Sequence, residues 1–305
     1  MKVIMEIIIV SYNAGDKLLR TLKSVLDQEG IEEGSRTDVR VIVKDGASTD
    51  ESVAAAKRFL DTCPQTKRDR VRILQGRDGG IYDAMNIALD ACMGRPGHAA
   101  SAKEEGVYRL VYFINCGDTL AGTKVLQTVS ERVRADLLQA GSGVRPPAIY
   151  YGDVMEDLTK ERVASNPRID DFALYRHVPC HQACFYDAAL FEKERFDTSL
   201  KVRADYDHFL KSCYRYRARC VYLPVLVAHY EGGGFSETGE NRKRSKSEHR
   251  IVLQRYMDAE TIRRYDRRMK LTLQPLRTYL AENKKTAAFY NAVRRTAYRI
   301  RGRES

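Results

Sequence analysis

The sequence predicts an α/β protein with a mainly parallel sheet, followed by a basic helical extension. Short β-branched runs alternate with helically periodic stretches through the first half of the chain, which is typical of a parallel sheet covered by helices on both faces. Polar, acid-rich turns follow four of these runs. Residues 240–305 hold 19 basic and 7 acidic residues, whereas residues 1–239 are nearly neutral. This asymmetry indicates an attached surface-binding segment.

Four strands are predicted in the first 120 residues by short apolar runs rich in Val and Ile: 6–10, 39–44, 71–74 and 109–114. Helices are expected from Asp16, from a Ser48/Glu51 capping box to about Leu60, and from about Gly122. A further helix begins after Gly80. Helical spacing predicts its buried face and a second, polar face: Ile81, Ala84, Met85, Ala88 and Leu89, against Asp83, Asn86 and Asp90.

The second half is less regular. Strands are expected at 149–151, at 183–186 and at 220–230, the last one broken at Pro224, and a helix is expected from Asp205. The small, polar stretch 94–106 reads as an exposed insertion, and 232–240 as a flexible loop. The remainder is predicted to be helical and basic.

Composition excludes several classes of protein. No apolar run approaches the roughly 18 residues that a transmembrane helix needs, and the short apolar stretch after Met1 lacks a cleavage-like site, so no signal peptide is expected. The seven cysteines form no CxxC pair, which favours a reducing cytoplasm over a disulfide framework. Cys180 and Cys184 flank His181 but lack the second pair of ligands that a zinc site needs.

The polar turns define where a ligand is expected. They are Ser11-Tyr12-Asn13, Asp45-Gly46, Asp78-Gly79-Gly80 and Asn115-Cys116-Gly117-Asp118. Ligands of parallel sheets bind beyond the carboxyl ends of the strands, so these turns are expected to converge on one crevice. Glycines before a helix suggest a phosphate cradle, yet Asp78 and Asp83 place carboxylates there.

Seven short motifs in this order resemble the family 2 inverting glycosyltransferases, and most closely the branch that builds bacterial surface polysaccharides. They are IIIVSYNAG, VIVKDGASTD, GRDGGIYDAMNIAL, LVYFINCGDTL, VPCHQACFY, RADYDHFLK and GGGFS. The resemblance implies a GT-A (Rossmann-like) fold over residues 1–239, with nucleotide binding in about 1–120, the acceptor side in about 121–239 and a basic helical tail at 240–305. It also implies a nucleotide-sugar donor, expected to be a UDP-sugar.

Most donor-binding residues follow from the resemblance. It implies that Tyr12 stacks on the base, that Asp45 accepts the uracil N3–H, and that Gly232–Ser236 closes over the diphosphate. A packed loop aromatic and turn capping by the Asp are the respective structural alternatives. The remaining residues expected to line the donor site are Ser11, Asn13, Asp83, Asn86, Asn115, His181, Gln182, Gly233 and Ser236. For His181, a satisfied core histidine is the alternative.

A divalent metal, Mn²⁺ or Mg²⁺, is the cofactor that the resemblance implies, because a departing diphosphate needs a cation and hard cations bind carboxylate oxygen. This would explain acids near phosphates. The family's Asp-x-Asp motif is reduced here to Asp118, and His229 is expected as a later ligand. Packing at the end of a strand is the alternative role for His229.

The general base is expected to be Asp205, the residue of RADYDHFLK that matches the family's carboxylate at a helix start. Inverting transfer needs such a base because the acceptor hydroxyl must lose a proton. Asp207 is the competitor, but two residues along a helix it points elsewhere. A plain charge at a helix N-terminus is the structural alternative for Asp205.

The basic tail is expected to hold the enzyme on the cytoplasmic face of the cell membrane, near a lipid-linked glycan acceptor. Residues 284–303 are basic, hold no acidic residue and carry a modest apolar stripe. Packing on its own domain or on another subunit, as a homo-oligomer, is the alternative. A nucleotide-sugar-binding protein without catalysis and a nucleic-acid-binding protein are rival functions, although no motif that reads RNA or DNA is present.

Overall fold

The computed structural model describes residues 1–32, 34–94, 106–139, 145–192, 194–232 and 239–271, together with residues 280, 283 and 286. The chain divides into two compact units, Met1–Val252 and Leu253–Ser305. The first unit extends beyond the expected boundary at residue 239 and includes most of helix α9 (Gly239–Tyr256). Nearly all of the expected insertion at 94–106 and most of the loop at 232–240 lie outside the described residues.

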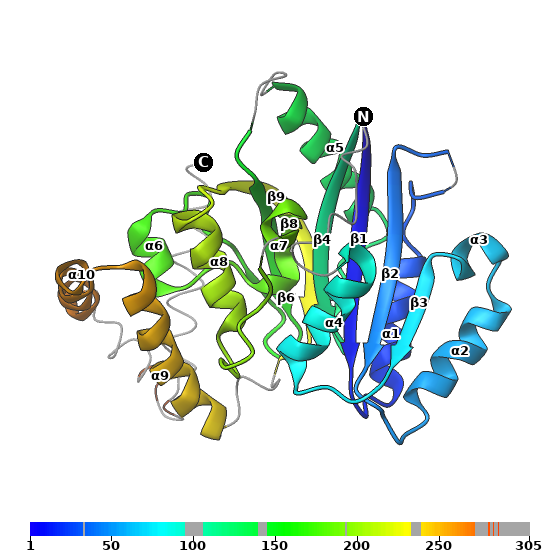
Figure 1. Cartoon of the computed structure of the whole chain (residues 1–305), viewed down its shortest axis with the longest axis horizontal. Helices are drawn as coiled ribbons and strands as arrows, with labels where there is room; N and C mark the ends of the chain where they lie inside the picture. Colours follow the sequence, from blue (N-terminus) through cyan, green and yellow to red (C-terminus); the bar gives the residue numbers. More distant parts are fainter. Residues whose placement is uncertain are drawn as a thin grey trace. The chain divides into compact units, whose positions relative to one another are not determined.

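One curled sheet organises the first unit (Figure 1). Within the described ranges its strands follow the order β3-β2-β1-β4-β8-β6-β9-β5, and β7 pairs with β6. Their bounds are Lys2–Ser11 (β1), Thr37–Asp45 (β2), Val71–Gln75 (β3), Val107–Asn115 (β4), Thr119–Leu120 (β5), Ala148–Glu156 (β6), Glu161–Val163 (β7), Cys184–Asp187 (β8) and Arg219–Tyr230 (β9). The strands predicted in the first half are confirmed, and each extends slightly beyond its apolar run.

The parallel pairing brings the predicted turns to one edge of the sheet. β1 pairs in parallel with β2 and with β4, and β2 pairs in parallel with β3. In this register Ser11 lies beside Asp45, and Val10 lies beside Asn115. The expectation of a mainly parallel sheet is confirmed, and β5, β7 and β8 add antiparallel pairings.

Helices cover both faces of the sheet. Their bounds are Asp16–Leu26 (α1), Ser52–Thr62 (α2), Gln65–Arg68 (α3), Ile81–Met93 (α4), Val125–Gln139 (α5), Asp171–Arg176 (α6), Ala189–Glu192 (α7), Ala204–Tyr214 (α8) and Ala259–Leu271 (α10), with a 3₁₀ turn at His181–Ala183. Figure 1 shows α4 crossing in front of the strands and α1 behind them. Alternate residues of a strand point to opposite faces, so Ile7 and Ile9 pack with Leu22 of α1 in the main core.

Two local predictions are wrong. Ser48 does not cap α2, because its hydroxyl donates to Asp45 and accepts from the backbone N–H of Asn13. The first turn of α2 is instead bonded by Asp50, which accepts from the N–H of Ser52 at 3.2 Å. In α4, Tyr82 is buried where Ile81 was expected to be.

The break expected at Pro224 is a bulge within a continuous strand. β9 runs from Arg219 to Tyr230, and its register with β6 shifts around Gly152. Proline has no N–H to donate to a ladder, and the bulge leaves Pro224 exposed. A Cβ on Gly152 would lie 2.4 Å from the carbonyl oxygen of Val225, so the bulge requires glycine opposite it.

Helix α9 fixes the start of α8. The Glu248 carboxylate is buried and accepts hydrogen bonds from the backbone N–H groups of residues 201, 202 and 203, each at 2.9 Å. The first turns of helices carry unsatisfied N–H groups and attract anions. Glu248 therefore anchors the segment that leads into Asp205.

Candidate functional site

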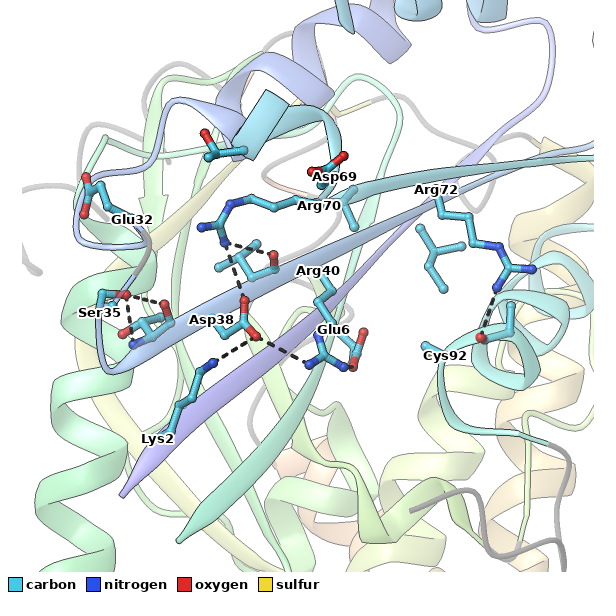
Figure 2. Close-up of a pocket in the computed structure, with 17 residues that line it drawn as sticks. Lys2, Glu6, Glu32, Ser35, Asp38, Arg40, Asp69, Arg70, Arg72 and Cys92 are labelled. Atoms are coloured by element: carbon cyan, nitrogen blue, oxygen red, sulfur yellow. Dashed lines mark hydrogen bonds and ion pairs between the residues drawn. The ribbon is translucent and has the colours of Figure 1, made fainter. Parts of the chain in front are cut away.

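The structure has a hollow at each end of the parallel strands. The first, of about 550 Å³, lies near the amino ends of β1 and β2. Figure 2 shows a cluster of paired charges around Asp38, which lies 3.2 Å from Lys2, 3.5 Å from Arg40 and 3.6 Å from Arg70. Burial raises the pKa of the Glu6 carboxyl in this hollow. The residues predicted from sequence to bind a ligand do not lie here.

The second hollow, of about 1030 Å³, lies beyond the carboxyl ends of β1, β2 and β4. Its lining includes residues from all four predicted turns: Ser11, Tyr12, Asn13, Gly46, Asp78, Gly79, Gly80, Asn115, Cys116 and Asp118. The predicted convergence is therefore confirmed. A large concave site with convergent polar groups is the usual location of a ligand.

Hydrogen bonds join the turns after β1 and β2. Asn13 accepts from the backbone N–H of Thr49 at 2.9 Å, and this side chain therefore holds the neighbouring turn. Asp45 is fully buried and accepts from the backbone N–H of Ser48 at 2.8 Å. Tyr12 is 69% exposed at the mouth of the hollow, so its ring is free to cover a flat ligand.

The glycine-opened helix has its carboxylates in structural contacts. Asp83 accepts from the N–H of Gly79 at 2.7 Å, and Asp78 lies 2.8 Å from the buried ammonium of Lys44. Lys44 also donates to the carbonyl oxygens of Asp45 and Gly76, so all three of its hydrogens are used. Sequence reasoning missed Lys44. A lysine inside a β-branched run, next to an Asp-Gly turn, was the available signal.

Asn86 lies outside the lining of this hollow. Its amide accepts from the backbone N–H of Phe196 and donates to the carbonyl oxygen of Phe196, both at 2.9 Å. Both ends of the side chain therefore hold the segment that precedes α8. The polar face predicted for α4 exists, but at this position it binds the protein's own backbone.

Asp118, the predicted metal ligand, is buried and lines the second hollow. One carboxylate oxygen accepts from Gln182 Nε2 at 2.9 Å, and the other accepts from the backbone N–H of Glu231 at 3.0 Å. Burial raises the pKa of Asp118. Glu231, which sequence reasoning missed, lines the same hollow and pairs with Lys17 at 2.6 Å.

The expected second metal ligand has another partner. His229 Nδ1 lies 3.0 Å from Asp157 Oδ1, and His229 is not part of the hollow's lining. In the described ranges no group of three or more His, Cys, Asp or Glu side chains is arranged to hold a metal. Gly233 and Ser236, expected at the diphosphate, lie outside the described residues.

Asp205 occupies the first turn of α8 and contacts two side chains from distant parts of the sequence. Tyr82 donates to Asp205 Oδ1 at 2.9 Å, and His181 Nδ1 lies 3.5 Å from Asp205 Oδ2. His181 Nε2 lies 3.3 Å from Asn115 Nδ2. Asn115 and Tyr82 both line the hollow, so this chain of four side chains links Asp205 to it.

The surroundings of Asp205 keep it ionised. Burial is the largest influence and acts to raise the pKa of Asp205, but the contacts with His181, the backbone N–H of Tyr206 and the hydroxyl of Tyr82 together lower the pKa from its usual value. The Asp205 side chain is 28% exposed. Asp207, by contrast, is 1% exposed and lies 3.7 Å from Lys211 on the same helix.

Sequence comparison shows that this chain is similar to known glycosyltransferases. The model of the family described as "Glycosyl transferase family 2" matches residues 6–96. Among curated proteins, the chain is similar to a PGL/p-HBAD biosynthesis glycosyltransferase of Mycobacterium bovis and to its counterpart in Mycobacterium tuberculosis. Each is 28% identical over 204 residues, which is 66% of this chain and 69% of the relative.

Solved structures share the fold at low sequence identity. Staphylococcus aureus TarS is 14% identical with a TM-score of 0.57, and the match covers 93% of this chain but only 44% of that chain. A TarS fragment in complex with UDP-GlcNAc is 15% identical with a TM-score of 0.58, and the match covers 87% of this chain and 70% of that chain. The mannosyltransferase PcManGT of Pyrobaculum calidifontis, with GDP-Man and Mn²⁺, is 17% identical with a TM-score of 0.58, and the match covers 96% of this chain and 75% of that chain. The fold is GT-A.

Proposed function

Because residues 6–96 of this chain match the model of glycosyl transferase family 2 and its curated relatives are glycosyltransferases, we propose that the chain transfers a sugar from a UDP-sugar to an acceptor hydroxyl with inversion at the anomeric carbon. The single observation that carries the proposal is the position of Asp205, which is ionised, partly exposed and linked through His181 and Asn115 to the hollow. A carboxylate in this state can take a proton from an incoming hydroxyl.

The donor occupies the second hollow. Its base stacks on the exposed ring of Tyr12, because an aromatic face binds a flat base with little loss of conformational freedom. Asp45 is the proposed acceptor of the uracil N3–H; because it is fully buried and is not part of the hollow's lining, the turn at Gly46 must shift for the base to reach it. Ser11 and Asn115 line the hollow, and the buried Oδ1 of Asn115 has no hydrogen-bond partner among the described residues.

A divalent metal fits one protein ligand here, Asp118. Each of its carboxylate oxygens accepts one hydrogen bond, which leaves a lone pair on each for a cation. When bound, Mn²⁺ or Mg²⁺ supplies positive charge to the departing diphosphate. Gln182 orients Asp118, and the Lys17 ammonium, 2.6 Å from Glu231, places a second cation at the same end of the hollow.

In the proposed chemical step, the Asp205 carboxylate takes the proton of the acceptor hydroxyl. The acceptor oxygen bonds to the anomeric carbon while its proton passes to the carboxylate. The bond from that carbon to the diphosphate oxygen breaks, and its electron pair leaves with the nucleoside diphosphate. Asp205 is ready for this role because its lowered pKa keeps it ionised at neutral pH.

The acceptor is a lipid-linked glycan at the cytoplasmic face of the cell membrane, in the synthesis of a surface polysaccharide. Supporting this, helix α10 carries Arg263, Arg264, Arg267, Arg268 and Lys270 within 13 residues, and such basic helices bind anionic lipid surfaces. In the described parts of the chain, no helix has both the length and the apolar character needed to cross a membrane.

A panel of UDP-, GDP- and TDP-sugars tests the function. UDP and its cognate sugar are expected to raise the melting temperature, because a ligand that binds only the native state stabilises it. The wild-type protein is expected to release UDP from that donor. Binding without release from any donor, with acceptors supplied, would favour the rival function of a nucleotide-sugar-binding protein.

A further inference from the structure

The hydroxyl of Tyr82 faces two acceptors at once. It lies 2.9 Å from Asp205 Oδ1 and 2.8 Å from the carbonyl oxygen of Val202. Tyr82 is in the first turn of α4 and is almost fully buried. The loop before α8 and α8 itself supply the two acceptors, and more than a hundred residues of sequence separate them from Tyr82.

A phenol carries one hydrogen but can also accept a hydrogen bond. When Asp205 is ionised, the Tyr82 hydroxyl donates its hydrogen to the unprotonated Oδ1 of Asp205. With a proton on Oδ1, the hydrogen bond reverses: Asp205 donates to the phenol oxygen, and the phenol hydrogen turns to the carbonyl oxygen of Val202. No heavy atom needs to move between these two states.

We propose that Tyr82 is a positioning residue that keeps Asp205 hydrogen-bonded in both of its protonation states. The inference rests on the proposed role of Asp205 as the base. During transfer, the acceptor O–H bond breaks and an O–H bond forms on Asp205. Tyr82 accepts the new hydrogen bond if the proton lies on Oδ1 and keeps donating to Oδ1 if the proton lies on Oδ2. The carboxyl group therefore holds its position through the catalytic cycle.

His181 and Asn115 hold the second oxygen of Asp205. The Asn115 amide nitrogen donates to His181 Nε2 at 3.3 Å, which leaves the ring hydrogen on Nδ1, facing Asp205 Oδ2 at 3.5 Å. The tautomer of a histidine is set by the hydrogen bond of its other nitrogen. Asp205 is thus held from two sides, closely by Tyr82 and more loosely by His181.

The other ionisable groups around Asp205 do not change charge between pH 5 and pH 9. Burial raises the pKa of Cys180 to about 12 and lowers the pKa of His208 to about 3. Burial also raises the pKa values of Cys184 and Tyr186 well above their usual ranges. Glu248 faces Tyr82 from α9 with its carboxylate bonded to backbone N–H groups. Because the pKa of Asp205 is lowered from its usual value, the acid limb is read below this window, where Cys180, Cys184 and Tyr186 keep their protons.

The pH profile of kcat in Tyr82→Phe tests the proposal. Removing a donor to the charged form disfavours ionisation, so the acid limb of the profile is expected to move to higher pH by about one unit. The KM for the donor should change little. Tyr151→Phe is the matched control, because its buried ring on β6 also loses a phenol–carbonyl bond, to Asn166 at 2.8 Å; its limb should match that of the wild type.

A second variant answers the concern that Tyr82→Phe fails to fold. Tyr82→3-fluorotyrosine keeps the ring nearly unchanged and makes the phenol a stronger donor, so its acid limb should move to lower pH. If the acid limb of the pH profile does not move in these Tyr82 variants while Asp205→Asn is inactive, the positioning role of Tyr82 is wrong and Asp205 is still the base. Wild-type turnover by Asp205→Asn overturns the base assignment itself.

Discussion

At the scale of single residues, the carboxylates of Asp118, which lines the hollow, and of Asp205, which is linked to it through Tyr82, differ in their surroundings. Asp118 is buried and burial raises its pKa, whereas contacts with His181 lower the pKa of Asp205. Environments that push the pKa values of neighbouring acids apart mark different chemical roles. Asp205 is suited to accept a proton, and Asp118 needs a compensating cation to carry its charge.

Replacing Asp205 by Asn keeps the size of the side chain and removes its ability to accept a proton. We expect kcat to fall on the order of a hundredfold or more, with binding of UDP retained in a thermal-shift titration. Asp207→Asn is the control, since Asp207 is buried beside Lys211. It should lose stability but keep turnover, and the opposite pattern would make Asp207 the base.

Chelation tests Asp118. EDTA is expected to abolish sugar transfer and Mn²⁺ to restore it, because Asp118 would hold the cation that offsets the charge of the departing diphosphate. Asp118→Asn should weaken Mn²⁺ binding in the presence of UDP, followed by the electron paramagnetic resonance of free Mn²⁺. His229→Ala should leave this titration unchanged if its bond to Asp157 is its main role. A rate that is insensitive to EDTA would assign the diphosphate to Lys17 and its basic neighbours.

Single residues were the hardest part to predict from the sequence. The spacing of motifs placed Ser11, Tyr12, Asn115 and Asp118 in one hollow correctly. It could not show that Asn86 binds the backbone of Phe196, because that contact joins segments far apart in the chain. Periodicity assigns a face to a side chain but not a partner.

At the scale of elements, the junction of α8 and α9 decides how Asp205 is presented. Glu248→Ala removes a buried carboxylate that accepts three backbone hydrogen bonds. Leaving such donors unsatisfied costs about 1–3 kcal/mol, so we expect the melting temperature to fall by roughly 2–12 °C and kcat to fall with it.

Glu240→Ala is the matched control in the same helix. Glu240 is exposed and, among the described residues, pairs with Arg244 at 3.4 Å, and exposed ion pairs contribute little. Its melting temperature and kcat should stay close to those of the wild type. Equal effects of the two substitutions would show that Glu248 acts only as a surface charge.

His208, one turn after Asp205, makes α8 sensitive to acid. Its ring stacks on Phe191 with centroids 4.1 Å apart, and burial lowers its pKa to about 3. In the unfolded chain the His208 ring has its usual pKa of 6.5 and binds a proton below that pH, whereas the buried ring in the folded protein does not. The free energy of unfolding therefore decreases as the pH falls below 6.5. By linkage the loss is about 2 kcal/mol at pH 5.

His208→Phe removes this titration while keeping an aromatic ring on Phe191. Its melting temperature should fall less than that of the wild type between pH 7 and pH 5, as followed by circular dichroism. His249, whose pKa burial lowers to about 4, remains in both proteins and cancels from the difference. Parallel curves would show that His208 does not contribute to acid sensitivity.

The sequence predicted the regular elements better than the irregular ones. Long β-branched runs and apolar spacings gave β1, β2, β4 and α1 close to their observed bounds, since burial of one face determines them. Short strands such as β5 and β7 depend on pairing with β9 and β6 and have no pattern of their own. The capping box failed because Ser48 forms bonds across two loops.

At the scale of the whole molecule, the positive charge is concentrated in residues 240–305, whereas residues 1–239 are nearly neutral. Truncation after Tyr256 keeps Glu248 and the rest of the first unit, so hydrolysis of the donor should persist. Sedimentation with anionic vesicles should be lost, because each basic residue near anionic lipid contributes about 1 kcal/mol. Binding of the full-length protein should also weaken in high salt. A full-length protein that ignores anionic vesicles at low salt would favour a role of the tail in oligomerisation.

The most direct test of sugar transfer with inversion is the anomeric configuration of the product. The full-length protein is incubated with the UDP-sugar selected by the donor panel and an acceptor, and the anomeric proton is followed by nuclear magnetic resonance. An α-linked donor is expected to give a β-linked product together with one equivalent of UDP, and Asp205→Asn is expected to give neither. An α-linked product would contradict single displacement assisted by Asp205, and so would full activity in Asp205→Asn.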